Sequence, residues 1–203
     1  MRIVREANID VSTLIDEPKN FSQSPVFSAC IVAEHDLAFR MMKALVDLGI
    51  SATREDSLKQ TPLFYACREG NNQAVAYLVK DCRDNVNRQD KYGQTAIYYA
   101  AREGHIRTTQ LLIDLGADFD HADTKKQRPL YYAIQHNRFE MVKFLVDKGA
   151  DISTEDKKGV TPTMWAKKQN RQEIVDLLIE RGAAPASDPR RPKDNRGQFA
   201  SVK

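Results

Sequence analysis

The chain has 203 residues, of which 41% are hydrophobic, and a net charge of +3 at pH 7, as expected of a folded soluble protein. No apolar run approaches the roughly 20 residues of a membrane-spanning helix, so we expect that the chain does not cross a membrane. The first residues lack the apolar stretch of a signal peptide, so we expect that the protein is not exported. The three cysteines, Cys30, Cys67 and Cys82, are too few and too scattered for a disulfide framework or a zinc site, which favours the cytoplasm or nucleus.

Residues 1–20 contain "REANIDV", which is similar to "KGADIS" at Lys148–Ser153. We interpret these residues as an N-terminal cap or as a truncated copy of a unit that recurs later. An irregular cap would explain the similarity, and so would a chain cut from a longer polypeptide. The second alternative leads to a competing hypothesis, in which this chain is the regulatory or targeting part of a larger enzyme.

Residues 21–55 form a degenerate first copy of that unit. The segment "SPVFSAC" beginning at Ser24 is similar to "TPLFYAC" beginning at Thr61, and Leu45 then corresponds to Leu78. From the alanine of the motif to this leucine the first copy has 16 residues, against 12 in the second. Four residues are therefore inserted in the first copy, and we expect them around Ala33–Asp36.

Four regular copies follow, at residues 56–89, 90–122, 123–155 and 156–185. Their motifs read "KQTPLFYACREGN", "GQTAIYYAAREGH", "KQRPLYYAIQHNR" and "GVTPTMWAKKQNR". An aspartate before each motif and a leucine after it recur at spacings of 34, 33 and 33 residues: Asp56, Asp90, Asp123 and Asp156, then Leu78, Leu112, Leu145 and Leu178. A fixed period of this length indicates a stack of repeats.

Each copy predicts two short helices and a loop. Thr61–Pro62 and Thr161–Pro162 are typical helix starts, because threonine can cap free N–H groups and proline suits the first turn. Gly70 and Gly104 permit the left-handed turn that ends the first helix. A second helix and an extended hairpin loop follow. One copy cannot bury its apolar residues alone, whereas stacked copies can.

These units resemble ankyrin repeats, whose pattern D-x-x-G-x-T-P-L-H-x-A-A-x-x-G-H is followed by V-x-x-L-L-x-x-G-A-D. The resemblance is strong from Asp56 to Ala184 and weak from Phe21 to Glu55. It implies an all-α fold: an ankyrin-repeat solenoid of five stacked helix-turn-helix units joined by hairpin loops, the first repeat degenerate and the fifth a C-terminal cap.

The chain departs from the family pattern in two respects. Lysine replaces the loop glycine at Lys59 and Lys126, which would strain the backbone if that position needs a positive φ. The family's histidine is replaced in all four regular copies, which we expect to remove a recurrent hydrogen bond: Phe64, Tyr98, Tyr131 and Met164. In addition, Lys167 stands where earlier copies have Cys67, Ala101 and Ile134, as suits a last repeat whose outer side meets solvent.

Nothing in the sequence indicates catalysis, a metal site or a cofactor. The histidines His35, His105, His121 and His136 show no metal-ligand spacing, and no nucleophile or phosphate-binding glycine motif appears. The cysteines occupy helix and helix-end positions, which favours a packing role. We therefore predict that the chain is not an enzyme.

The resemblance implies that a partner binds the concave side, formed by the first helices and the loops. One aromatic residue per regular repeat falls there: Tyr65, Tyr99, Tyr132 and Trp165. They are either half-buried packing residues or contacts for a peptide, since tyrosine and tryptophan are enriched in binding hot spots. The segment "VTPTMWA" also resembles ankyrin repeats of certain histone methyltransferases that bind methyl-lysine, but the carboxylate expected one turn after Trp165 is missing.

Basic residues gather on the same side in the later repeats. The candidate partner-binding residues besides the four aromatics are Lys91, Tyr92, Arg102, Lys125, Arg128, Lys157, Lys158 and Lys168. They either form a solvated surface or favour an acidic or phosphorylated segment. The sequence thus predicts a monomeric, non-catalytic module that binds another protein or peptide.

Residues 186–203 form a tail that we expect to be disordered, because it is rich in proline and charge and poor in apolar residues. The segment from Ala184 to Lys203 has five basic residues against two acidic ones, and so carries the whole net charge. A basic tail of this kind allows at most weak nucleic-acid binding.

Overall fold

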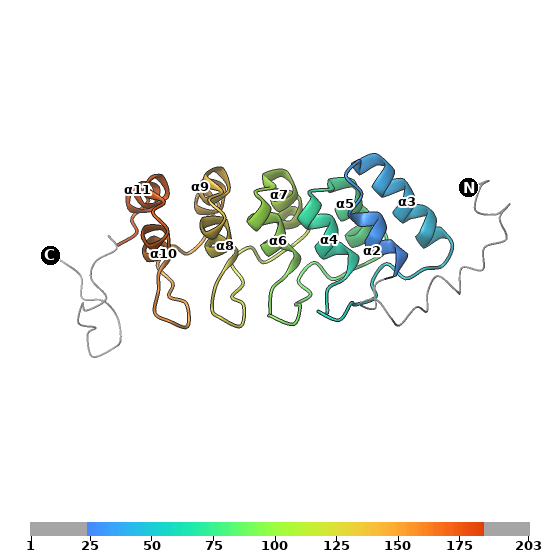
Figure 1. Ribbon diagram of the computed structural model, residues 1–203, viewed down its shortest axis with the longest axis horizontal. Coiled ribbons are helices and arrows are strands. Elements are labelled where there is room, and N and C mark those ends of the chain that lie inside the picture. Colours follow the sequence, from blue (N-terminus) through green and yellow to red (C-terminus); the bar gives the residue numbers. More distant parts are fainter. Residues whose placement is uncertain (1–23, 185–203) are drawn as a thin grey trace.

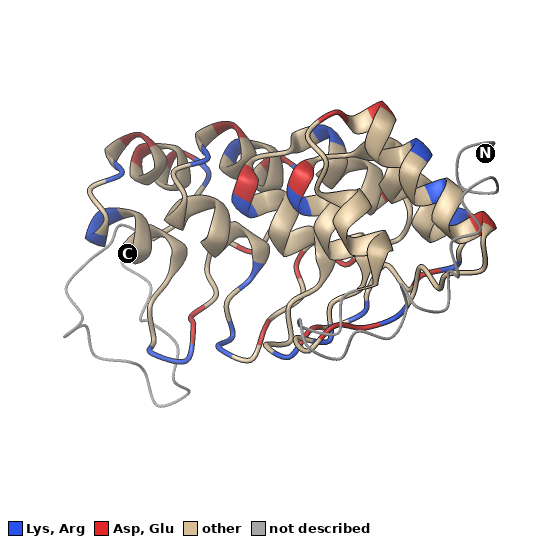
Figure 2. Ribbon diagram, turned by 45° about the vertical axis from the view of Figure 1, so that its right-hand side comes forward, with Lys and Arg blue, Asp and Glu red and all other residues tan. Residues whose placement is uncertain are grey.

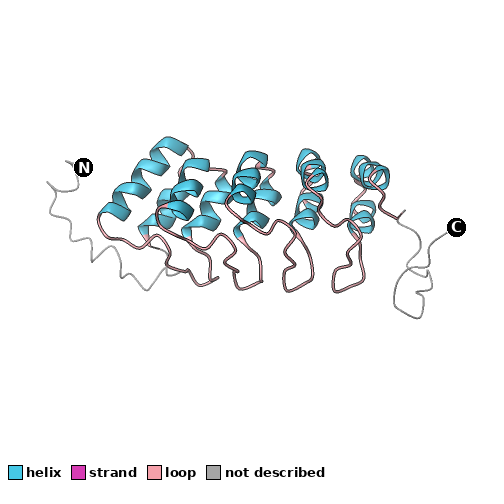
Figure 3. Cartoon of the chain, turned by 180° about the vertical axis from the view of Figure 1, so that it is seen from behind, coloured by secondary structure: helices cyan, strands magenta, loops and turns pink. Residues whose placement is uncertain are grey.

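The computed structural model describes residues 24–184, which form ten helices and no strand. Figure 1 shows them as a row of helix pairs in which the loops between successive pairs project to the same side, and Figure 3 shows the same row from behind. The helices are α2 (Pro25–Cys30), α3 (His35–Asp47), α4 (Pro62–Glu69), α5 (Asn72–Lys80), α6 (Ala96–Glu103), α7 (Ile106–Asp114), α8 (Pro129–Gln135), α9 (Phe139–Asp147), α10 (Pro162–Lys168) and α11 (Gln172–Glu180). The predicted all-α repeat solenoid is confirmed.

The helices form two layers. The first helices of the pairs contact one another in order along an inner row (α2, α4, α6, α8, α10), and the second helices do so along an outer row (α3, α5, α7, α9, α11). Each pair falls within one of the five predicted repeats, whose boundaries remain predictions. The similarity at "REANIDV" and the tail at 186–203 lie outside the described residues.

The core runs along the junction of the two layers. The periodic leucines Leu78, Leu112, Leu145 and Leu178 are all fully buried. Two clusters of buried side chains, one reaching from α2 to α7 and the other mainly from α8 to α11, both contact Phe119. Lys167 is exposed, whereas its counterparts Cys67 and Ala101 are fully buried, as predicted for a last repeat.

The first pair accommodates the four inserted residues inside a helix rather than in the turn around Ala33–Asp36. Helix α3 has 13 residues and α5 has 9. The turn before each is equally long, since Glu34 follows Ala29 by as many residues as Asn71 follows Ala66. Four residues add about one turn of α-helix, so the buried face of α3 keeps its direction.

Both predicted helix starts are confirmed, but only one of the two threonines caps its helix. Proline occupies the first turn of both α4 and α10, as predicted. The Thr161 hydroxyl caps α10 by accepting from the Met164 N–H, but the Thr61 hydroxyl does not cap α4. It donates instead to Asp84 Oδ2 at 2.6 Å, because that buried carboxylate lies within its reach.

Left-handed residues end the first helices. Gly70 and Gly104 have φ of 73° and 87°, and Asn137 and Asn170 take the same region at the equivalent positions, with φ of 55° and 56°. Asparagine tolerates this conformation better than most residues with a side chain. Lys59 and Lys126 also have positive φ, so the predicted strain at these loop lysines is present.

Gly70 also permits a close contact with the next repeat, which yields a testable prediction. A Cβ at Gly70 would lie 2.9 Å from the His105 ring, whereas a Cβ at Gly116, with φ of 90°, would meet nothing within 4 Å. We expect Gly116→Ala to cost about 1 kcal/mol from backbone strain alone, and Gly70→Ala about 2 kcal/mol because His105 must also move. Urea unfolding of both variants checks this; equal costs would show that the His105 contact adds nothing.

Two tyrosines correct the expectation that losing the family's histidine removes a hydrogen bond. The Tyr98 hydroxyl lies 2.5 Å from the His121 carbonyl oxygen, and the Tyr131 hydroxyl lies 2.5 Å from that of Thr154. Each hydroxyl therefore donates at the end of its own repeat, where the chain enters the next loop, and it also lies within 3.0 Å of a carbonyl oxygen of that loop, Gln127 or Val160. Only Phe64 and Met164, which have no hydroxyl, make no such bond.

Candidate functional site

The four regular loops are built around their repeated aspartates. In each loop one carboxylate oxygen accepts hydrogen bonds from the backbone N–H groups two and four residues further on, as Asp156 does from Lys158 and Val160. Backbone bonds also join neighbouring loops, for example from the Lys157 N–H to the Lys125 carbonyl oxygen at 2.9 Å. The loops are thus held in register with one another.

The second oxygen of each aspartate binds the aromatic residue of its own repeat. These distances are 2.8 Å from Tyr65 to Asp56, 2.8 Å from Tyr99 to Asp90, 2.9 Å from Tyr132 to Asp123, and 3.1 Å from Trp165 Nε1 to Asp156. Glutamines link successive repeats: Gln60 donates to Asp90 and Tyr99, Gln94 to Tyr132, and Gln127 to Asp156. We call this set the Asp–Gln–aromatic network.

The four aromatic residues, one in each regular repeat, differ in how far they are buried. Tyr65 and Tyr99 are only 9% and 5% exposed, so they are packing residues and offer little surface to a partner. Tyr132 and Trp165 are partly exposed. Burial and the neighbouring Asp90 raise the pKa of Tyr99, as burial and Asp123 raise that of Tyr132, so both hydroxyls stay protonated donors.

The network keeps Asp156 ionised. Burial pushes the pKa of its carboxyl group upward, but hydrogen bonds from Trp165, Val160, Gln127 and Lys158 outweigh burial and leave the pKa below its usual value. All of these bonds go to the carboxylate, so its charge is satisfied within the protein.

Cations of the chain lie over three rings of the aromatic row, those of Tyr65, Tyr99 and Trp165. The Arg68 guanidinium lies 5.0 Å from the Tyr65 centroid and 4.9 Å from that of Tyr99, and Arg102 lies 5.0 Å from Tyr99. Lys168 Nζ lies 5.7 Å from the Trp165 centroid. Arg68 was missed by the sequence analysis, although its place three residues after Tyr65 matches that of Arg102 after Tyr99.

A hollow of about 440 Å³ opens between the loops and inner helices of the fourth and fifth repeats. Two partly exposed aromatics, three exposed lysines, two buried polar residues and one glutamine of α8 line it: Tyr132, Trp165, Lys125, Lys157, Lys158, Gln127, Asp156 and Gln135. Five of these eight belong to the predicted binding residues, so the fold brings them together.

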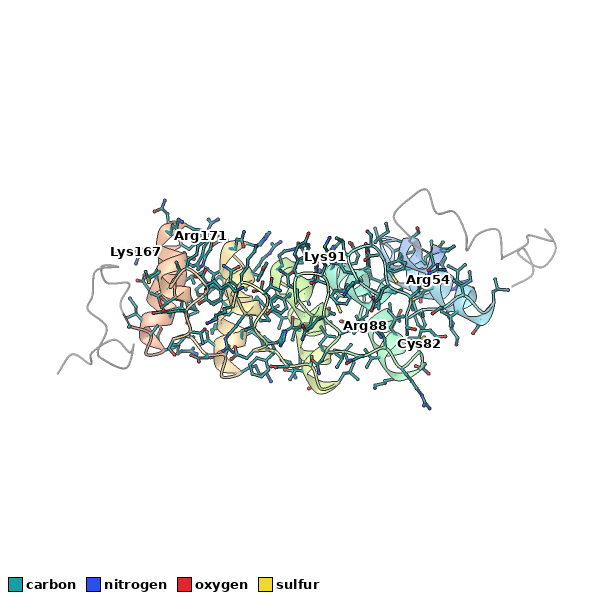
Figure 4. All side chains as sticks on the ribbon, turned by 90° about the horizontal axis from the view of Figure 1, so that it is seen from below. Arg54, Cys82, Arg88, Lys91, Lys167 and Arg171 are labelled. Carbon is teal, nitrogen blue, oxygen red and sulfur yellow. The ribbon has the colours of Figure 1, made fainter. Side chains whose placement is uncertain are left out.

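The remaining basic candidates differ in availability. Lys91 and Tyr92 are exposed at the tip of the loop of the third repeat, and Tyr92 is 47% exposed. Figure 2 shows basic residues recurring at the loop ends, and Figure 4, which looks onto those ends, labels Lys91. Arg128 is already engaged by the Asp120 carboxylate, and Arg102 by Glu103 at 2.8 Å.

Two of the cysteines, Cys30 and Cys67, are buried in the core, and the ring nitrogens of two histidines hold hydrogen bonds within the protein. Burial raises the pKa of the Cys30 thiol to about 12 and raises that of Cys67, which disfavours the reactive thiolate. A ring nitrogen of His105 is hydrogen-bonded to the Arg68 carbonyl oxygen at 2.9 Å, and a ring nitrogen of His121 is hydrogen-bonded to the Gly93 carbonyl oxygen at 3.1 Å.

Within residues 24–184, no three His, Cys, Asp or Glu side chains are grouped so as to hold a metal ion. None of the described helices is long and apolar enough to cross a membrane.

The sequence matches the family model described as ankyrin repeats in three copies, over residues 3–90, 29–123, 82–156 and 115–188. A comparison with curated proteins found no match. Ankyrin repeats are generally protein-interaction modules and are typically non-catalytic. Since the matches span most of the chain and coincide with its stacked helix pairs, the chain belongs to the ankyrin repeat family.

Proposed function

We propose that this chain is a non-catalytic interaction module that binds an extended, acidic or phosphorylated segment of another protein along the concave side of repeats two to five. The observation that supports this most is the group of exposed lysines at consecutive loop tips, beside partly exposed aromatic rings: Lys125, Lys157 and Lys158 with Tyr132 and Trp165.

Charge supports an acidic partner. The backbone bond from Lys157 to Lys125 fixes the fourth and fifth loop tips beside each other, so their like charges cannot separate by moving the loops apart. The nearby Asp156 is buried and its carboxylate is bonded within the protein, so it offsets this field but offers no binding surface. Clustered cations of this kind attract anions and speed their approach.

Charge reversal at the loop tips tests the proposal. We expect Lys125→Glu with Lys158→Glu to weaken binding of a fluorescein-labelled peptide of alternating glutamate and glycine, measured by anisotropy at low salt. Two reversed surface contacts of about 0.5–1 kcal/mol each would lower affinity about five- to thirtyfold. Added salt should shrink the difference, because it screens exposed charges.

A matched control separates local from overall charge. Lys43→Glu with Lys143→Glu makes the same change of net charge at exposed positions of α3 and α9 in the outer row. We expect this variant to bind nearly as the unaltered chain does, and both variants to keep its melting temperature. Equal weakening by the two pairs, or none by either, would refute a binding site at the loop tips.

A methyl-lysine reader fits these contacts less well. Lys168 Nζ already lies against the Trp165 ring, where a methylated ammonium would bind. The three lysines around the hollow would also repel a cationic ligand. The same features favour an anionic segment.

A further inference from the structure

The row of cations over the aromatic rings is interrupted in the fourth repeat. Each covering residue stands three positions after its aromatic residue, on the same helix face: Arg68 after Tyr65, Arg102 after Tyr99 and Lys168 after Trp165. The fourth repeat has Gln135 in this position. Among the cation–ring contacts of residues 24–184, none involves the ring of Tyr132, and the hollow of about 440 Å³ opens at this place.

The polar groups deep in the hollow are already bonded. Asp156 Oδ2 accepts from Trp165 Nε1 at 3.1 Å and from Gln127 Nε2 at 3.0 Å. The Tyr132 hydroxyl donates to Asp123 at 2.9 Å and accepts from Gln94 at 2.6 Å. What remains for a ligand is the apolar ring surface of Tyr132 and of the part of Trp165 that lines the hollow, with the exposed Gln135 side chain beside it.

The charges around the hollow select the occupant. An anion placed beside Asp156 would be repelled by this ionised carboxylate and would also lose its hydration, at a considerable cost in free energy. A cation would have to pass Lys125, Lys157 and Lys158. An uncharged apolar side chain meets neither penalty, and acidic residues beside it in its own chain would reach these lysines.

We propose that the hollow between the fourth and fifth repeats receives one large apolar side chain, such as phenylalanine, from a segment with acidic residues on both sides of it. This inference rests on the proposed function and adds an anchor residue to it. Gln135 determines where the anchor binds, because this position leaves the Tyr132 ring uncovered. The lysines at the loop tips bind the flanking carboxylates.

Peptides that differ only at the anchor test this in the unaltered chain. Two short peptides of glutamate and glycine, with either phenylalanine or alanine at the centre, carry the same charge. Trp165, the only tryptophan of the chain, lies in the hollow, so its fluorescence reports occupancy directly. We expect the phenylalanine peptide to bind about tenfold more tightly, in line with burial of one aromatic side chain, and to shift the emission of Trp165.

The variant Gln135→Arg distinguishes the effect of filling the hollow from the effect of added positive charge on peptide binding. The new guanidinium should lie over the Tyr132 ring as Arg102 lies over Tyr99, and so fill the hollow. Its added positive charge by itself would tighten binding of both acidic peptides. We expect the preference for phenylalanine over alanine to fall from about tenfold to less than twofold, while alanine-peptide affinity stays equal or rises. His136→Arg, one residue away and outside the lining of the hollow, should keep the preference.

The outcomes distinguish the two proposals. A tenfold preference that Gln135→Arg abolishes supports the anchor site. Equal binding of both peptides, with weakening by Lys125→Glu and Lys158→Glu, overturns the anchor site and leaves the proposed function standing. Failure of both peptides to bind overturns both. A preference that persists in Gln135→Arg shows that the anchor binds elsewhere, which also overturns the inference.

Discussion

Leu112→Ala is expected to lower the free energy of unfolding by about 2–5 kcal/mol, the range typical of leucine removal from a well-packed core. Leu112 is fully buried in α7, and this helix contacts α5 on one side, α9 on the other and α6 of its own repeat. A cavity there cannot close by the movement of one helix alone. Because a repeat protein is stabilised through contacts between adjacent repeats, damage in the middle of the stack affects both neighbours.

Urea unfolding followed by circular dichroism measures this cost. Ile179→Ala is the matched control, since Ile179 lies in an outer-row helix, α11, but is 41% exposed. We expect the control to cost less than about 1 kcal/mol. A loss below about 0.5 kcal/mol for Leu112→Ala, the size of a neutral surface change, would contradict the packing of the outer row described above.

Asp90→Ala is expected to cost about 3–5 kcal/mol, because buried donors lose a charged acceptor. The Asp90 side chain accepts four hydrogen bonds. One oxygen binds the backbone N–H groups of Tyr92 and Gln94 at 2.8 and 3.0 Å, and the other binds Gln60 Nε2 and the Tyr99 hydroxyl at 3.1 and 2.8 Å. Without the carboxylate, the loop of the third repeat loses these four side-chain hydrogen bonds, including the one from Gln60 of the second repeat, and keeps only backbone bonds such as that from Lys91 to Leu58.

The matched control is Asp118→Ala, in a loop on the same side of the stack. Asp118 is exposed, and its carboxylate accepts from the backbone N–H of Asp120 at 3.0 Å. We expect a cost below about 1 kcal/mol for the control in the same urea experiment. Asp90→Asn should lie between the two, since an amide keeps one acceptor but turns an N–H toward the donors of Gln60 and Tyr99. Equal effects of Asp90→Ala and Asp118→Ala would mean that the Asp–Gln–aromatic network adds no stability.

Much of the fold can be predicted from the sequence because it depends on local and periodic signals. The recurring aspartates and leucines define the period, and each leucine proves fully buried. Glycine and proline mark the helix ends through backbone restrictions that apply in any context. The surface position of Lys167 likewise follows from a charged residue in a column that is otherwise apolar.

The candidate site is less predictable, because its character depends on contacts between different repeats. Tyr99 and Trp165 occupy equivalent positions in the sequence, yet Tyr99 is only 5% exposed and Trp165 lines an open hollow. Arg128 counted as a binding cation until the fold placed Asp120 against it. The hydrogen bonds of Tyr98 and Tyr131 to the following loops could not be inferred from a histidine position read one repeat at a time.

The sequence by itself determined that this chain is a stack of helix pairs, because each copy of the 33- or 34-residue unit carries its own helix starts and ends and can bury its leucines only against its neighbours. It also supplied the lysines at the loop tips, since exposed charges require no partner within the protein. Only the tertiary structure decided which aromatic rings are covered, because the cations and hydrogen bonds that cover Tyr99 come from both its own repeat and the one before. The hollow at Tyr132 has the same origin: it exists where stacked repeats leave one ring without a cation.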